Sequence, residues 1–124
     1  MKRVMVFGVF DGIHDGHRDF FKQARELGDE LIAVVAHDHI AKHLKGRLPQ
    51  RDLAERFEHL KQEDGVNNVV EGDRELSSWK VIEKYKPDII ALGYDQAILK
   101  KDLEGSLKKL NVHPEIKVLK SYEI

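Results

Sequence analysis

The sequence predicts an α/β domain with a parallel five-stranded sheet flanked by helices on both faces. Short apolar runs alternate with segments of helical spacing along the whole chain, and this alternation is typical of parallel sheets with right-handed crossovers. The chain has 124 residues, which fits one compact domain spanning residues 1–124. No internal repeat or low-complexity segment interrupts the pattern.

The expected strands are short runs rich in Val, Ile, Leu or Phe, bounded by turn residues or helical patterns. In chain order they are Val4–Phe10, Leu31–Ala36, Val69–Glu71, Asp88–Leu92 and Glu115–Leu119. In such sheets ligands bind beyond the carboxyl ends of the strands, near the point where the strand order reverses. The segments that follow the strand ends are Phe7–His17, Ala36–Lys45, Glu71–Glu75 and Gly93–Gln96.

Helices are expected between these strands. Phe20, Phe21, Ala24 and Leu27 recur at helical spacing before Gly28, a favourable C-cap residue. A short helix is expected at Asp38–Leu44, and a further helix capped by Asp52 carries Leu53, Phe57 and Leu60 on one face. The next helix is capped by Ser77 or Ser78, carries Trp79, Ile82 and Tyr85, and stops at Pro87. The last helix stops at Asn111 and has one apolar stripe, formed by Leu99, Leu103, Leu107 and Leu110.

The composition excludes several classes of protein and site. The formal net charge is −1, so no basic footprint for nucleic acid is present. The chain has no cysteine, which removes disulfides, thiolate zinc sites and a cysteine nucleophile. The N-terminal apolar run is too short for a signal peptide, and no stretch approaches membrane-spanning length. We therefore expect a cytoplasmic protein without membrane contact.

The stretch GVFDGIHDGH, residues 8–17, lies where the first strand gives way to a helix. Its glycines allow a sharp turn and a close approach to a ligand, and a helix starting near Gly16 offers free N–H groups and the positive end of its dipole to an anion. His14 and His17, three residues apart, can add imidazole N–H donors. The alternatives are two surface histidines beside a turn, or a metal pair, which the absence of a third ligand nearby disfavours. We predict no metal ligands in the chain.

This stretch resembles the signature of the cytidylyltransferase-like nucleotidyltransferases, [GT]-x-F-D-x-x-H-x-G-H. The resemblance runs from Met1 to about Leu119, and the segments KGRLP and KPDIIALGYDQ are similar to archaeal-type FAD synthetases. It implies a Rossmann-like domain and a direct in-line transfer, in which a phosphate oxygen of an acceptor attacks the α-phosphorus of a nucleoside triphosphate and pyrophosphate leaves. It further implies Mg²⁺ bound with the nucleotide, no permanently bound cofactor, and a homodimer. The implied partners are ATP or CTP and a small phosphorylated acceptor.

The resemblance also assigns roles to residues of this sequence. The catalytic residues are expected to be His14, His17 and Lys45, and the acceptor is expected to contact Asp11 and Asp38. The expected nucleotide-binding residues are Gly8, Val9, Phe10, Gly16, Lys42, Arg47, Arg56, Gly93, Tyr94 and Asp95. Val9 stands where many relatives carry Thr, so a phosphate contact there would come from the backbone N–H alone.

Each assignment has a structural alternative. Asp11 could instead pin a loop through backbone N–H groups or form an Asx turn, and Asp95 could be a helix N-cap. Lys42, Lys45 and Arg47 could form a solvated basic turn, and Arg56 a surface salt bridge. Relatives of this kind usually carry a Ser/Thr-rich motif after the last strand, where this chain has only Ser121.

Several functions remain open from the sequence. The leading hypothesis is a nucleotidyltransferase, with FMN adenylylation favoured over glycerol-3-phosphate cytidylylation. A second hypothesis is a nucleotide-binding module without catalysis, and a third is an interaction domain of the same fold that binds no triphosphate.

Overall fold

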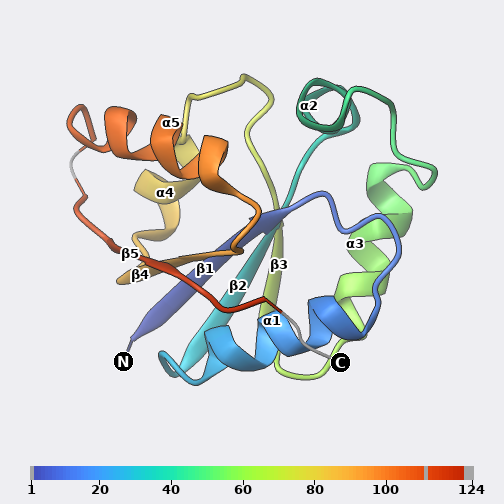
Figure 1. Cartoon of the computed structure of the whole chain (residues 1–124), viewed down its shortest axis with the longest axis horizontal. Helices are drawn as coiled ribbons and strands as arrows, with labels where there is room; N and C mark the ends of the chain where they lie inside the picture. The colour runs from blue at the N-terminus through green and yellow to red at the C-terminus, as the bar shows by residue number, and fades with distance from the viewer. Residues whose placement is uncertain (1, 111, 122–124) are drawn as a thin grey trace.

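The computed structural model describes residues 2–110 and 112–121, which form a single parallel five-stranded sheet with the order β3-β2-β1-β4-β5 (Figure 1). In chain order the elements are β1 Arg3–Gly8, α1 Asp15–Arg25, β2 Glu30–Val35, α2 Asp38–Lys45, α3 Leu53–Lys61, β3 Asn68–Glu71, α4 Lys80–Tyr85, β4 Ile89–Leu92, α5 Ala97–Leu107 and β5 Glu115–Val118. The structure confirms the predicted α/β class and all five predicted strands. The predicted helix stop at Asn111 lies outside the described residues.

Alternate residues of β1 enter two separate cores, one on each face of the sheet. Val4 and Val6 pack with Phe21 of α1 and Leu60 of α3. On the other face, Met5 and Phe7 pack in a cluster completed by α4 and α5 (Figure 1), whose buried residues are Val81, Ile82 and Leu103. β1 is therefore a central strand buried on both sides, which explains its continuous apolar run.

The strand order reverses between β1 and β4. The chain moves outward from β1 through β2 to β3, and α4 then leads it back to β4 on the other side of β1. Pairing of β1 with β2 extends to Gly8 opposite Val35, whereas pairing of β1 with β4 is limited to Val4 opposite Ile89 and Met5 opposite Ile90. The carboxyl ends of β1 and β4 therefore form the switch point at which ligands bind in such folds.

Two predicted helix caps are wrong, and the alternative in which Asp95 caps the helix after β4 is not observed. The C-cap of α1 is Glu26 rather than Gly28, and Gly28 lies against the first strand, where an added Cβ would be 2.8 Å from the carbonyl oxygen of Lys2. The N-cap position of α4 is held by Trp79, whose ring packs edge-on against Phe7 at 5.3 Å. The N-cap of α5 is the residue after Asp95. In the first two cases tertiary packing, rather than local capping preference, sets the helix end.

The α4 entry obtains its capping from a distant carboxylate. Asp73 accepts hydrogen bonds from the backbone N–H of Lys80 and from the hydroxyl of Ser78. Neither Ser77 nor Ser78 caps the helix through its own side chain, as the sequence had suggested. Within the described part of the chain, none of the helices is both long and apolar enough to span a bilayer.

Candidate active site

The turn after β1 is built around the buried ring of Phe10. Phe10 has a positive φ of 54° and lies over Gly8, where an added Cβ would be 2.6 Å from the ring. The ring contacts Phe21 with centroids 5.5 Å apart and the edge of His17 at 5.7 Å. Phe10 is thus a core side chain that also packs against the imidazole of His17. Gly8 is required because only a residue without Cβ fits against the ring of Phe10.

His14 and His17 cap the start of α1 reciprocally. Nδ1 of His14 accepts a hydrogen bond from the backbone N–H of Gly16 at 3.0 Å, and Nδ1 of His17 accepts one from the backbone N–H of His14 at 3.3 Å. The two rings lie 4.0 Å apart. An Nδ1 that accepts carries no proton, so the neutral imidazoles hold their protons on Nε2. The pair therefore offers two Nε2–H donors from one rigid helix start.

This capping corrects the expectation that the helix presents free N–H groups at Gly16. The N–H of Gly16 is already donated to His14. Elsewhere in the turn, no described residue accepts the backbone N–H of Val9 or of Phe10. The backbone N–H groups of Val9 and Phe10 are therefore available to bind a phosphate. The N–H of Gly16, in contrast, is already bound to His14.

The electrostatics of His17 keep its ring neutral. Burial is the main cause that lowers the pKa of His17 from 6.5 to about 4, and the neighbouring His14 and the positive charge of Lys45 contribute to the same shift. The carboxylate of Asp95 opposes this shift. Lys45 and Asp95 are thus both close enough to His17 to act on its charge, although they follow β2 and β4. The structure brings these predicted residues to the same edge of the sheet.

The depressed pKa of His17 predicts a pH-dependent stability. Between about pH 6.5 and pH 4 the unfolded state binds a proton at His17 that the folded state excludes, so the free energy of unfolding falls as the pH falls through this window. Above this window the contribution vanishes. Urea unfolding of wild type and of His17→Asn at several pH values across this window measures the decline, because asparagine does not bind a proton in this range.

The matched control for this experiment is His59→Asn, since His59 is exposed on α3. It should keep the pH dependence of the wild type. An identical decline in His17→Asn and wild type would contradict the prediction.

Arg56 is buried at the centre of the loops around the site. Its side chain is 0% exposed and donates to the carbonyl oxygens of Val9 and Ala36, each at 2.8 Å, and of Arg51 at 3.0 Å. It also pairs with a carboxylate oxygen of Asp38 at 2.5 Å. Arg56 is therefore a buried anchor of these loops rather than a surface salt bridge. It joins the loops that follow β1 and β2 to the start of α3.

Asp11 fixes the loop before α3. Its two oxygens accept from the backbone N–H groups of Gln50 at 2.8 Å and Arg51 at 3.0 Å, and the pKa of Asp11 is lowered, chiefly by the hydrogen bond from Gln50. The loop-pinning interpretation is confirmed, and the bonds run to residues far along the chain rather than within an Asx turn. Arg51, which the sequence did not single out, is bound by both Asp11 and Arg56.

The basic residues after β2 are presented to solvent. Lys42 and Lys45 lie in the last turn of α2, which ends at Gly46 in the left-handed conformation, and Arg47 follows. All three are exposed, and no carboxylate of the described residues forms an ion pair with them. These cations are available to an anionic ligand at the carboxyl edge of the sheet.

The loop after β4 approaches the site from the other side of β1. Tyr94 is 65% exposed. At Gly93 an added Cβ would lie 2.9 Å from a carboxylate oxygen of Asp95, so a side chain there would displace the Asp95 carboxylate. Gln96, to which the sequence analysis assigned no role, holds this loop: its side chain accepts from the N–H of Gly93 at 2.8 Å and donates to the carbonyl oxygen of Phe7 at 2.9 Å.

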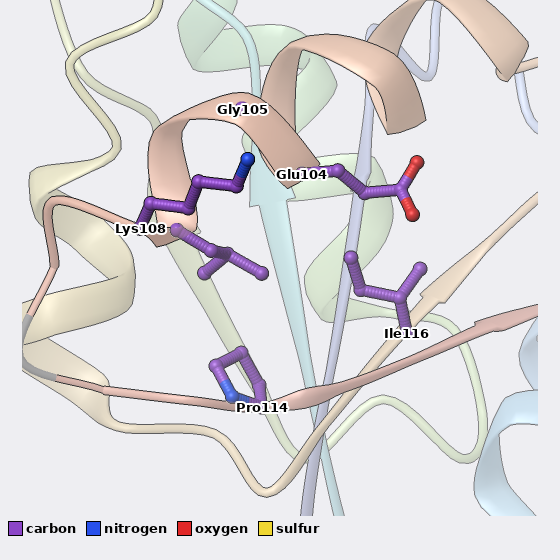
Figure 2. A pocket seen from close by; sticks show the side chains of 6 residues that line it. Glu104, Gly105, Lys108, Pro114 and Ile116 are labelled. Carbon is purple, nitrogen blue, oxygen red and sulfur yellow. The ribbon is translucent and has the colours of Figure 1, made fainter.

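Among the described residues, the other histidines do not join a metal cluster, and the groove beside α5 is separate from the expected site residues. His37 is buried with Nε2 3.7 Å from Glu71, and His39 contacts the carbonyl oxygen of Arg74. No group of three His, Asp or Glu that could hold a metal occurs in residues 2–110 and 112–121. A groove of about 620 Å³ between the end of α5 and β5 (Figure 2) contains none of the expected site residues and is lined by Glu104, Gly105, Leu107, Lys108, Pro114 and Ile116.

Comparisons with known proteins identify the family of the chain. The chain is 46% identical over 114 residues to the FAD synthase of Thermococcus sibiricus and 47% identical over 114 residues to that of Pyrococcus horikoshii, and each match covers 92% of this chain and 77% of the relative. A crystal structure described as the lipopolysaccharide core biosynthesis protein from Thermoplasma volcanium GSS1 superposes with a TM-score of 0.89 at 35% identity and covers 99% of both chains. The family model described as cytidylyltransferase-like matches residues 5–123. The chain belongs to the cytidylyltransferase-like family and is a nucleotidyltransferase.

Proposed function

We propose that the protein is an FMN adenylyltransferase, which transfers AMP from ATP to FMN and releases pyrophosphate. The observation that carries the proposal is the reciprocal cap, which sets the Nε2–H groups of His14 and His17 side by side at the start of α1. The choice of substrates is supported by the FAD synthase relatives at 46% and 47% identity. They favour adenylylation over the alternative of glycerol-3-phosphate cytidylylation.

The transfer needs positioning and charge stabilisation rather than a nucleophile from the protein. A phosphate oxygen of FMN forms a bond to the α-phosphorus of ATP, while the bond from that phosphorus to the bridging oxygen breaks and the electron pair leaves with pyrophosphate. Negative charge builds on the α-phosphate oxygens and on the bridging oxygen. The imidazole donors of His14 and His17 stabilise this charge in their neutral form.

Cations and loops supply the rest of the proposed site. Lys45, with Lys42 and Arg47, neutralises the triphosphate from the exposed end of α2. Tyr94 and Asp95 contact the base and ribose. Asp38 is assigned to the acceptor, and its pairing with Arg56 uses only one of its two carboxylate oxygens among the described contacts.

Mg²⁺ enters the proposal as part of the ATP substrate. Mg²⁺ is usually held by substrate phosphates with one or two carboxylates rather than by an all-protein cage. This mode fits a site whose described residues contain no group of three His, Asp or Glu that could hold the ion on its own. The metal would supply additional neutralisation of the phosphate charge.

A direct assay tests the proposal. The protein is incubated with ATP or CTP, Mg²⁺, and either FMN or glycerol 3-phosphate, and both pyrophosphate and the nucleotide product are measured. FAD and pyrophosphate in equal amounts from ATP and FMN are expected. Pyrophosphate only from CTP and glycerol 3-phosphate would replace the proposal with the alternative, and triphosphate binding without turnover would support a non-catalytic module.

Light scattering in solution tests the proposed homodimer, and cell fractionation tests the proposed cytoplasmic location.

Lys45→Met tests the proposed cation clamp. A charge-assisted hydrogen bond contributes about 1.5–3 kcal/mol, so kcat/KM for ATP should fall about ten- to hundredfold. Steady-state kinetics measure this loss. Lys101→Met removes an exposed lysine of α5 and should leave kcat/KM unchanged. Equal kinetics for the two variants would exclude Lys45 from the clamp.

A further inference from the structure

The side chain of Gln96 bridges the two strands that flank the switch point. Backbone pairing of β1 with β4 is limited to Val4 with Ile89 and Met5 with Ile90. Toward the carboxyl ends, the amide of Gln96 contacts both β1 and the loop after β4, with Nε2 donating to the carbonyl oxygen of Phe7 at 2.9 Å and Oε1 accepting from the N–H of Gly93 at 2.8 Å. One side chain thus ties β1 to the loop after β4.

The backbone of Gln96 makes this bridge rigid. Gln96 occupies the N-cap position of α5, its N–H donates to the carbonyl oxygen of Gly93 at 3.0 Å, and its own carbonyl oxygen accepts from Lys100 at 2.9 Å. The side chain is partly buried. Because the bridge starts from a fixed helix end, a change in the side chain moves the loop rather than the helix.

The bridge separates two groups of residues that the proposed nucleotide must contact together. The turn that leads to His14 and His17 follows directly from β1, on which Phe7 lies. The loop of Tyr94 and Asp95 follows directly from Gly93. The amide of Gln96 therefore sets the spacing between the phosphate donors and the loop that faces the base and ribose.

We propose that Gln96 is a positioning residue that adapts the site to a ligand spanning both groups, a complete nucleoside triphosphate, rather than to inorganic polyphosphate. The proposal rests on the proposed function for the placement of the nucleotide. Glutamine is the residue type that fits this position, because its amide presents both an N–H donor and a carbonyl acceptor at the required reach. Glutamate would set a second acceptor against the carbonyl oxygen of Phe7, and asparagine is one methylene shorter.

Two variants and two ligands test the proposal. Gln96→Met removes both hydrogen bonds at similar length, and Gln96→Glu replaces the donor by an acceptor. Binding of α,β-methylene-ATP, which spans both groups, and of tripolyphosphate, which reaches only the histidines and lysines, is measured by calorimetry with Mg²⁺. We expect the affinity for the ATP analogue to fall by about tenfold or more in both variants, while the affinity for tripolyphosphate stays within about twofold of wild type.

Gln23→Glu is the matched control. The amide of Gln23 makes the same kind of bridge between α1 and the backbone of Lys120, donating to its carbonyl oxygen and accepting from its N–H, each at 3.0 Å. This variant should weaken a bridge of the same chemistry. It should leave unchanged the ratio of the affinity for the ATP analogue to the affinity for tripolyphosphate.

The outcomes separate the positioning role from the proposed function. Equal weakening of both ligands in the Gln96 variants would show a general structural effect and overturn the proposal, as would unchanged binding of the ATP analogue. If wild-type protein bound the ATP analogue no more tightly than tripolyphosphate, the proposed contact of Tyr94 and Asp95 with the base and ribose would be wrong. If wild-type protein bound neither ligand, the proposed function itself would fail.

Discussion

Replacing His14 by Asn is expected to lower kcat by roughly 10²–10³-fold while leaving the protein folded, because one donor to the developing charge is lost. Asn is among the preferred N-cap residues, and its side-chain oxygen can accept from the N–H of Gly16 as Nδ1 of His14 does. The substitution therefore removes the Nε2–H donor and retains the cap. Steady-state kinetics and urea unfolding measure the two effects separately.

His17→Asn follows the same logic, since an oxygen at the Nδ1 position can still accept from the N–H of His14. His14→Ala is the informative comparison: it loses the donor and the cap, and should cost about 1 kcal/mol of stability in addition to the loss of kcat. His59→Asn on α3 should leave kcat unchanged. If His14→Asn retained the kcat of wild type, the imidazole would serve only as a cap.

The sequence was sufficient to predict the sheet because each strand carries its own apolar signal. β1 and β2 are continuously apolar since helices cover both faces, and such runs separated by helical patterns leave few alternatives to a parallel sheet. The location of the site was predictable for a related reason. In parallel sheets the carboxyl ends meet at one edge, and the structure brings Lys45 and Asp95 within electrostatic reach of His17 there.

The contacts that complete the site have no periodic signal. Gln96 contacts Phe7, which is 89 positions away, and Arg56 contacts Val9, 47 positions away. Such pairs depend on how loops from different strands meet, which neither spacing nor residue preference encodes. The wrong cap at Gly28 has a similar cause, because that glycine is required by the close approach of Lys2 rather than by the end of α1.

Replacing Arg56 by Met is expected to destabilise the protein by about 3 kcal/mol, because three carbonyl groups lose their donors and each buried unpaired group costs about 1–3 kcal/mol before water or local relaxation restores part of it. Those carbonyl groups belong to Val9, Ala36 and Arg51. Met is long enough to fill most of the space without offering a hydrogen bond. Urea unfolding measures the loss, and activity at low urea should fall with it, since the loops after β1 and β2 share this anchor.

Two further variants separate the ion pair from the carbonyl contacts. Asp38→Asn keeps an oxygen for the guanidinium and leaves all three carbonyl bonds in place, so it should destabilise the protein by less than Arg56→Met does. Arg18→Met removes an exposed arginine that is paired with Asp15 and Glu63, and surface pairs of this kind contribute little. A free energy of unfolding for Arg56→Met equal to that of Arg18→Met would show that the buried guanidinium does not anchor the loops. A larger loss for Asp38→Asn than for Arg56→Met would instead show that the uncompensated buried charge dominates.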